Sequence, residues 1–69
     1  MMKETKGNRL HSIMANKGIS IADLAYRIGC SRADVARWCA DILDLTDNDV
    51  RKIAIALRMP SNELIGLLN

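Results

Sequence analysis

Apolar residues recur along this chain with the spacing of a helix face, in five short stretches separated by polar or turn-forming residues. In the first stretch, Leu10, Ile13 and Met14 stand at positions i, i+3 and i+4 and share one face. No stretch shows the strict alternation of apolar and polar residues that is typical of a strand. The pattern predicts an all-α protein with five helices at about residues 6–16, 20–28, 31–40, 46–58 and 61–68.

Short polar sequences mark where these helices begin. Ser or Thr followed three residues later by Asp predicts a capping box, in which side chain and backbone satisfy each other at a helix N-terminus. The pattern opens the second, third and fourth helices, at Ser20/Asp23, Ser31/Asp34 and Thr46/Asp49. Ser61, which follows Pro60, is expected to cap the last helix.

The break between the second and third helices, Gly29-Cys30-Ser31, has the character of a tight turn. Gly29 tolerates the positive φ that such a turn requires, and Ala25 is small enough to let two helices cross closely. Val35 supplies an apolar residue that faces inward, and Trp38 follows one turn later as an expected core residue. These spacings predict a helix-turn-helix.

The length of the chain allows one small domain. A chain of 69 residues buries only about 60% of its unfolded surface, so a partner would add useful stability. Residues 1–6 are polar and are expected to form a flexible N-terminus, which leaves 7–69 as a single helix-turn-helix domain. We expect a cytoplasmic protein without a membrane partner, because no secretory signal and no apolar run of spanning length is visible.

Positive charge is concentrated in the half of the chain that holds the predicted helix-turn-helix. Residues 1–37 contain seven Lys or Arg and three acids, which gives +4, and residues 38–69 contain three and five, which gives −2. The sum is the net charge of +2. This asymmetry fits a polyanion partner and fits ordinary surface charge equally well.

The titratable residues form no arrangement typical of catalysis or metal binding. A single His, His11, and two Cys without CxxC spacing do not predict a zinc site. The acids between residues 41 and 49 lack the central Gly and terminal Glu of a calcium-binding EF-hand loop. We therefore expect no enzyme activity, cofactor, metal or small-molecule substrate. Both thiols are expected to be reduced, with Cys30 a buried hydrophobe and Cys39 more exposed.

Several short segments, in order and at matching spacing, resemble the phage repressor/Cro-type helix-turn-helix domains, also called XRE-like or lambda-repressor-like. The matching segments are 17–20, 23–25, 28–31, 35–38 and 53–57. The resemblance covers roughly residues 9–65. It implies a compact five-helix lambda-repressor-like bundle that binds double-stranded DNA as a homodimer on a palindromic operator and regulates transcription.

The resemblance also implies which residues meet DNA. The third helix, from Arg32 to Cys39, would enter the major groove as the recognition helix. Residues at its exposed positions would contact bases, and Arg there pairs well with guanine. The expected base contacts are Ser31, Arg32, Ala33 and Arg37, with Asp34 as a capping acid or, alternatively, a cytosine reader. The expected phosphate contacts are Arg9, Lys17, Ser20, Ile21 and Arg27.

This sequence departs from the family pattern at three places. Met14 stands where a phosphate-binding Arg is common, and Ile21 stands where a Gln is common. Residues 41–45, Asp-Ile-Leu-Asp-Leu, replace a loop that is usually rich in Gly and cations. Fewer phosphate contacts lower non-specific affinity. An alternative therefore stays open, in which the chain is a protein-interaction module (an antirepressor or a partner-binding regulator) that keeps the fold.

Apolar residues outside the expected core indicate a second surface. Some lie in the connector before the fourth helix, and others lie on the fourth and fifth helices. They predict a homodimer interface, although a slightly larger core would also account for them. The candidates are Ile42, Leu43, Leu45, Ile55, Ile65 and Leu68.

Overall fold

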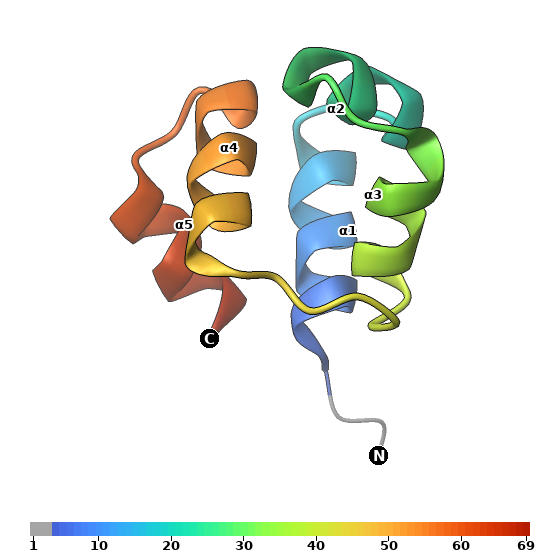
Figure 1. The fold of residues 1–69 in the computed structure, drawn as a ribbon. Coiled ribbons are helices and arrows are strands. Elements are labelled where there is room, and N and C mark those ends of the chain that lie inside the picture. Colours follow the sequence, from blue (N-terminus) through green and yellow to red (C-terminus); the bar gives the residue numbers. More distant parts are fainter. Residues whose placement is uncertain (1–3) are drawn as a thin grey trace.

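The computed structural model describes residues 4–69, which fold into five helices (Figure 1). In chain order these are α1 (Lys6–Asn16), α2 (Ile21–Ile28), α3 (Arg32–Cys39), α4 (Asp47–Leu57) and α5 (Ser61–Leu68). Residues 4–69 contain no strand. The predicted all-α fold is confirmed, and the predicted helix bounds agree with the observed ones to within a residue.

The helices form a small bundle around α1 and α4. α2 packs against α3 and α4, α1 packs against α3 and α5, and α4 packs against α5. α2 lies at the top of the view and the connector from α3 to α4 crosses at the bottom (Figure 1). In the part of the chain that the structure describes, no helix has the length and apolar character needed to cross a membrane.

The core is built from aliphatic side chains contributed by all five helices. Leu10 and Met14 of α1, Leu24 of α2, Val35 of α3 and Ile53 of α4 are almost fully buried. Each such side chain stabilises the fold by about 1.5–3 kcal/mol relative to exposure. The other buried apolar residues are Ala25, Trp38, Val50, Ala54, Ala56, Leu57, Leu64 and Leu68.

Trp38 lies in this core, as the sequence predicts, and is 5% exposed. Its indole Nε1–H is buried and meets no hydrogen-bond acceptor among residues 4–69. A buried donor without a partner costs stability, because it has lost its hydrogen bond to water. Trp38 therefore stabilises the fold through its apolar surface and not through its polar atom.

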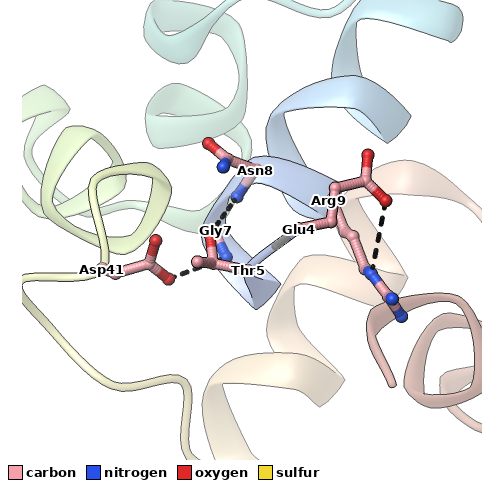
Figure 2. A network of polar contacts seen from close by, with 6 residues as sticks. All are labelled: Glu4, Thr5, Gly7, Asn8, Arg9 and Asp41. Atoms are coloured by element: carbon pink, nitrogen blue, oxygen red, sulfur yellow. Dashed lines mark hydrogen bonds and ion pairs between the residues drawn. The ribbon is translucent and has the colours of Figure 1, made fainter. Parts of the chain in front are cut away.

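Side-chain caps begin four of the helices. Thr5 Oγ1 accepts from Asn8 N–H at 3.1 Å at the start of α1 (Figure 2). Thr5 and Lys6, which we assigned to the flexible N-terminus, therefore belong to a capped helix start, while residues 1–3 of that segment lie outside the described residues. At the start of α5 the N-cap is Pro60, without a side-chain bond. The expected Ser61 cap is thus wrong, since Ser61 is already the first residue of that helix.

The three predicted capping boxes are not alike. In α2, Ser20 N–H donates to Asp23 Oδ2 at 3.3 Å, and the α4 box formed by Thr46 and Asp49 is likewise complete. In α3, Ser31 Oγ accepts from Asp34 N–H at 3.1 Å, but no bond returns from Ser31 N–H to the Asp34 carboxylate. The predicted capping box of α3 is therefore only half formed.

The connector between α3 and α4 is joined to the start of α1. Asp41 has a positive φ of 60°, and its Oδ1 accepts from Gly7 N–H at 3.0 Å (Figure 2). Gly7 is buried, and a Cβ there would lie 2.5 Å or less from the carbonyl oxygens of Trp38 and Cys39. The first turn of α1 can approach the end of α3 this closely only because residue 7 is a glycine.

Candidate nucleic-acid interface

The helix-turn-helix is held by a closed turn on the carbonyl of Ala25. Gly29 N–H and Cys30 N–H donate to Ala25 O at 2.8 and 3.0 Å. Gly29 has φ 85°, the left-handed conformation that the sequence predicts for it. Ala25 is 2% exposed and Val35 is fully buried, which fixes α3 against α2. The turn therefore sets which face of α3 is free.

The free face of α3 combines two small and two cationic residues. Successive residues of a helix are turned by about 100° around its axis. On the free face of α3 this places Ala33 and Ala36 near the middle, Arg37 beside Ala33, and Arg32 toward the opposite edge. All four residues are exposed. The alanines allow the helix backbone to come close to another surface, and the arginines supply donors that reach beyond it.

Arg37 is held by another side chain of the same helix. Its Nη1 donates to Asp34 Oδ1 at 3.3 Å, and the two side chains are 55% and 41% exposed. The carboxylate of Asp34 is thus bound to Arg37 and not to the N-cap backbone, as the predicted capping box would require, while its backbone N–H still donates to Ser31 Oγ. Such a pair on a helix surface adds little to stability.

The start of α2 offers backbone N–H donors, in addition to the arginine side chains of α3. Ser20 is exposed, and both its hydroxyl and its N–H are used within the capping box. Ile21 is half-buried and packs against the core, so its side chain serves the fold. The N–H of Asp23 donates to Ser20 Oγ, so Ile21 and Ala22 are the first-turn residues whose N–H groups have no partner within the helix. These two groups lie at the positive end of the helix dipole.

The predicted phosphate-contacting cations do not form one cluster. Arg9 lies in the first turns of α1 and pairs with Glu4 at 3.6 Å (Figure 2), whereas Lys17 follows the other end of that helix, about 12 Å away along its axis. Arg27 donates through Nη1 to Ala56 O at 3.0 Å and so holds the end of α4 to α2. Lys17 and Arg27 thus line one hollow, and Arg9 lies apart from them.

One cation was missed by the sequence reasoning. Arg58 ends α4 with φ 58° and lines the same shallow hollow as Lys17 and Arg27. Its position just before Met59-Pro60 was the available signal, because a cation favourably ends a helix. Three helices end at this hollow, so their negative dipole ends offset much of its positive charge.

The candidate dimer residues divide into three groups. Ile42 and Ile55 are 76% and 77% exposed, and Leu43 and Ile65 are 41% and 42% exposed. Leu45 is half-buried and lines two adjoining hollows, one with Leu43 and one with Ile65. Leu68 is 4% exposed, so its inclusion was wrong: it packs into the core and cannot face a partner.

The two thiols are free, and both are half-buried. Cys39 packs against the core, which corrects the expectation of an exposed thiol there. Burial raises the pKa of both Cys30 and Cys39 above 9.0, because the thiolate would lose its hydration. Among residues 4–69, no three His, Cys, Asp or Glu side chains are grouped in a way that would hold a metal ion.

The family of the chain is established by its similarity to known proteins. Residues 9–68 match the model of the Cro/C1-type helix-turn-helix DNA-binding domain. The chain therefore belongs to this family of DNA-binding transcription regulators. The resemblance to the repressor/Cro type is confirmed. No curated protein sequence matches the chain.

Two solved structures share the fold. The restriction-modification controller protein C.AhdI from Aeromonas hydrophila is 29% identical, with a TM-score of 0.78 over 86% of this chain and 89% of that chain. The clp gene regulator ClgR from C. glutamicum has a TM-score of 0.82 over 91% of this chain and 82% of that chain. At 17% identity, the likeness to ClgR concerns the fold alone.

Proposed function

We propose that this chain is a sequence-specific regulator that inserts α3 into the major groove of duplex DNA. The observation that carries the proposal is the free face of α3, where Arg32 and Arg37 flank two exposed alanines. A helix of this size fits the major groove, and a bidentate Arg–guanine contact discriminates against other bases by about 1–3 kcal/mol. Ala33 offers a methyl group for contact with a thymine methyl.

Phosphate contacts would come from the start of α2 and from nearby cations. The N-terminus of α2 presents first-turn N–H groups, and Lys17 lies three residues before its N-cap Ser20. Arg9 and Arg27 already have partners within the chain, in Glu4 and Ala56. We therefore expect fewer phosphate contacts than the five residues predicted from the sequence, and an affinity for DNA that depends only weakly on salt concentration.

The test is selection of bound duplexes from a randomised pool, followed by affinity measurements at two salt concentrations. Arg32→Ala and Arg37→Ala should each remove a base preference while circular dichroism shows unchanged helix content. Arg51→Ala, an exposed cation on α4, is the matched control and should keep the preference. Wild-type preferences in both α3 variants would refute the recognition-helix assignment.

We further propose that the chain binds as a homodimer on a palindromic site. The exposed apolar residues Leu43 and Ile65 are bridged by Leu45 into one face that joins the connector to α5. Ile55 lies elsewhere, in a hollow with Arg27 and Arg58. Light scattering should show that Leu43→Glu and Ile65→Glu weaken the dimer and that Ile55→Glu does not. A wild-type monomer at all concentrations would contradict this proposal.

A second candidate function is a protein-interaction module with weak DNA binding. The observation that favours it is the connector 41–45, which has no cation and exposes Ile42. Titration of random duplex at low salt discriminates between the two functions. Salt-dependent binding supports the regulator, and its complete absence supports the protein-interaction module.

A further inference from the structure

We infer that Asp34 is a positioning residue, which orients Arg37 for the recognition of one guanine in each half-site. This inference rests on the proposed function. Its first support is the contrast among the three N-terminal boxes. The aspartates of α2 and α4 return a bond to the N-cap backbone, at 3.3 and 3.1 Å, whereas the carboxylate of Asp34 turns to Arg37 instead.

The geometry of the pair leaves Arg37 able to bind a base. Nη1 is committed to Asp34 Oδ1 at 3.3 Å. The guanidinium has five N–H donors in a rigid plane, so the edge formed by Nε and Nη2 stays free. This edge presents two parallel donors, which match the O6 and N7 acceptors of guanine. Holding Nη1 thus reduces the rotational freedom of the group without using its reading edge.

The position of Asp34 anchors it for this role. Its backbone N–H donates to Ser31 Oγ at 3.1 Å, which fixes the residue in the first turn of α3. Its side chain stands three residues before Arg37, a spacing at which helical side chains meet. A lone carboxylate on a face that meets DNA would be repelled by phosphates, and the pairing with Arg37 offsets that charge.

Stability does not account for the arrangement. An exposed ion pair at this spacing contributes little to folding. The carboxylate meanwhile leaves Ser31 N–H without the reciprocal bond that the other two boxes make. The aspartate thus gives up one structural role in α3 while gaining a contact with the residue best placed to read a base.

The experiment compares base preferences of wild type, Asp34→Ala, Asp34→Glu, Arg37→Ala and the double variant Asp34→Ala/Arg37→Ala. Arg37→Ala should lose guanine preference at one position. Asp34→Ala should reduce preference at that same position roughly three- to tenfold, and Asp34→Glu should restore it. In the Arg37→Ala background, the further substitution Asp34→Ala should leave the base preferences unchanged.

A second readout separates positioning from a structural role. Asp34→Ala removes a negative charge from the DNA-facing side, so its affinity for random duplex should rise while its base preference falls. A structural defect would lower both. Asp49→Ala is the matched control: it removes an acid from the same position of the α4 box and should keep wild-type base preference.

Three outcomes would overturn the inference. If Asp34→Ala keeps the guanine preference, Arg37 needs no orientation. If Asp34→Ala still lowers a base preference in the Arg37→Ala background, and the base concerned is a neighbouring cytosine, then Asp34 contacts a base itself. If wild type selects no duplex at all, the proposed function fails and the inference fails with it, which distinguishes this case from the first two.

Discussion

The backbone N–H of Gly7 donates to the carboxylate of Asp41 at 3.0 Å, across 34 residues of chain (Figure 2). Gly7 lies in the first turn of α1, where backbone N–H groups have no partner within the helix. Asp41 supplies both a hydrogen bond and a negative charge at the positive end of the helix dipole. The acid that departs from the family pattern thus has a structural role, as a cap for a distant helix.

Gly7→Ala should destabilise the fold by about 1–3 kcal/mol, because the added Cβ would meet the carbonyl oxygens of Trp38 and Cys39 and the carboxylate of Asp41. Gly66→Ala is the control: apart from its chain neighbours and the backbone of its own helix, no atom lies within 4 Å of its Cβ position, and alanine favours the helix by up to about 1 kcal/mol. Urea unfolding of both variants measures the difference. Equal stabilities would contradict the close packing at Gly7.

Arg27 is expected to act mainly through the end of α4. Arg27→Met keeps the aliphatic stem but removes the donor to Ala56 O, so the free energy of unfolding should fall by about 0.5–1.5 kcal/mol. Affinity for random duplex should change less than in Lys17→Met. Denaturant titration and fluorescence anisotropy measure the two quantities. A variant with full stability and weakened DNA binding would instead make Arg27 a phosphate contact.

Because the indole N–H of Trp38 has no partner among residues 4–69, we expect the fold to tolerate phenylalanine at this position. Trp38→Phe removes some apolar contact but also removes the buried donor, so stability should change by no more than about 1 kcal/mol. Trp38→Ala, which empties the site, should cost about 3–5 kcal/mol. Thermal unfolding compares the two variants. A large loss in Trp38→Phe would indicate that the N–H has an acceptor, such as a bound water.

The capping box of α2 should make stability sensitive to acid. The backbone N–H of Ser20, and next its hydroxyl, hold the pKa of Asp23 below its ordinary value of 3.8. The folded state therefore favours the carboxylate, and this stabilisation is complete above pH 3.8 and is lost as the pH falls through the lowered pKa. Asp23→Asn should remove this part of the pH dependence. Carbon-detected NMR titration checks the pKa directly, and a value at or above 3.8 would contradict the prediction.

Much of the fold could be predicted because its helix starts, its turn and its buried faces are determined by residues that are close together in the sequence. Ser20, Thr46 and Gly29 determine where helices begin and turn through bonds to residues only a few positions away, so their roles are visible in the sequence. The buried face of α1 follows from periodicity alone. These are the features for which sequence neighbours are also spatial neighbours.

The parts that could not be predicted depend on contacts between distant segments or on a choice between equivalent local partners. The Gly7–Asp41 bond and the Arg27–Ala56 bond join residues far apart in the chain. Asp34 had two nearby partners of similar value, the Ser31 backbone and Arg37, and nothing in the sequence distinguishes them. Leu68 lies on a short helix whose register against the core only the fold determines.

The bond between Gly7 and Asp41 has a kinetic consequence. It closes a long loop in a protein whose other side-chain caps at helix N-termini are local, and long loops are entropically costly to close early in folding. We expect the bond to form after the transition state. Asp41→Ala should then leave the folding rate nearly unchanged and accelerate unfolding, so that this carboxylate lengthens the time for which the native bundle survives before it opens.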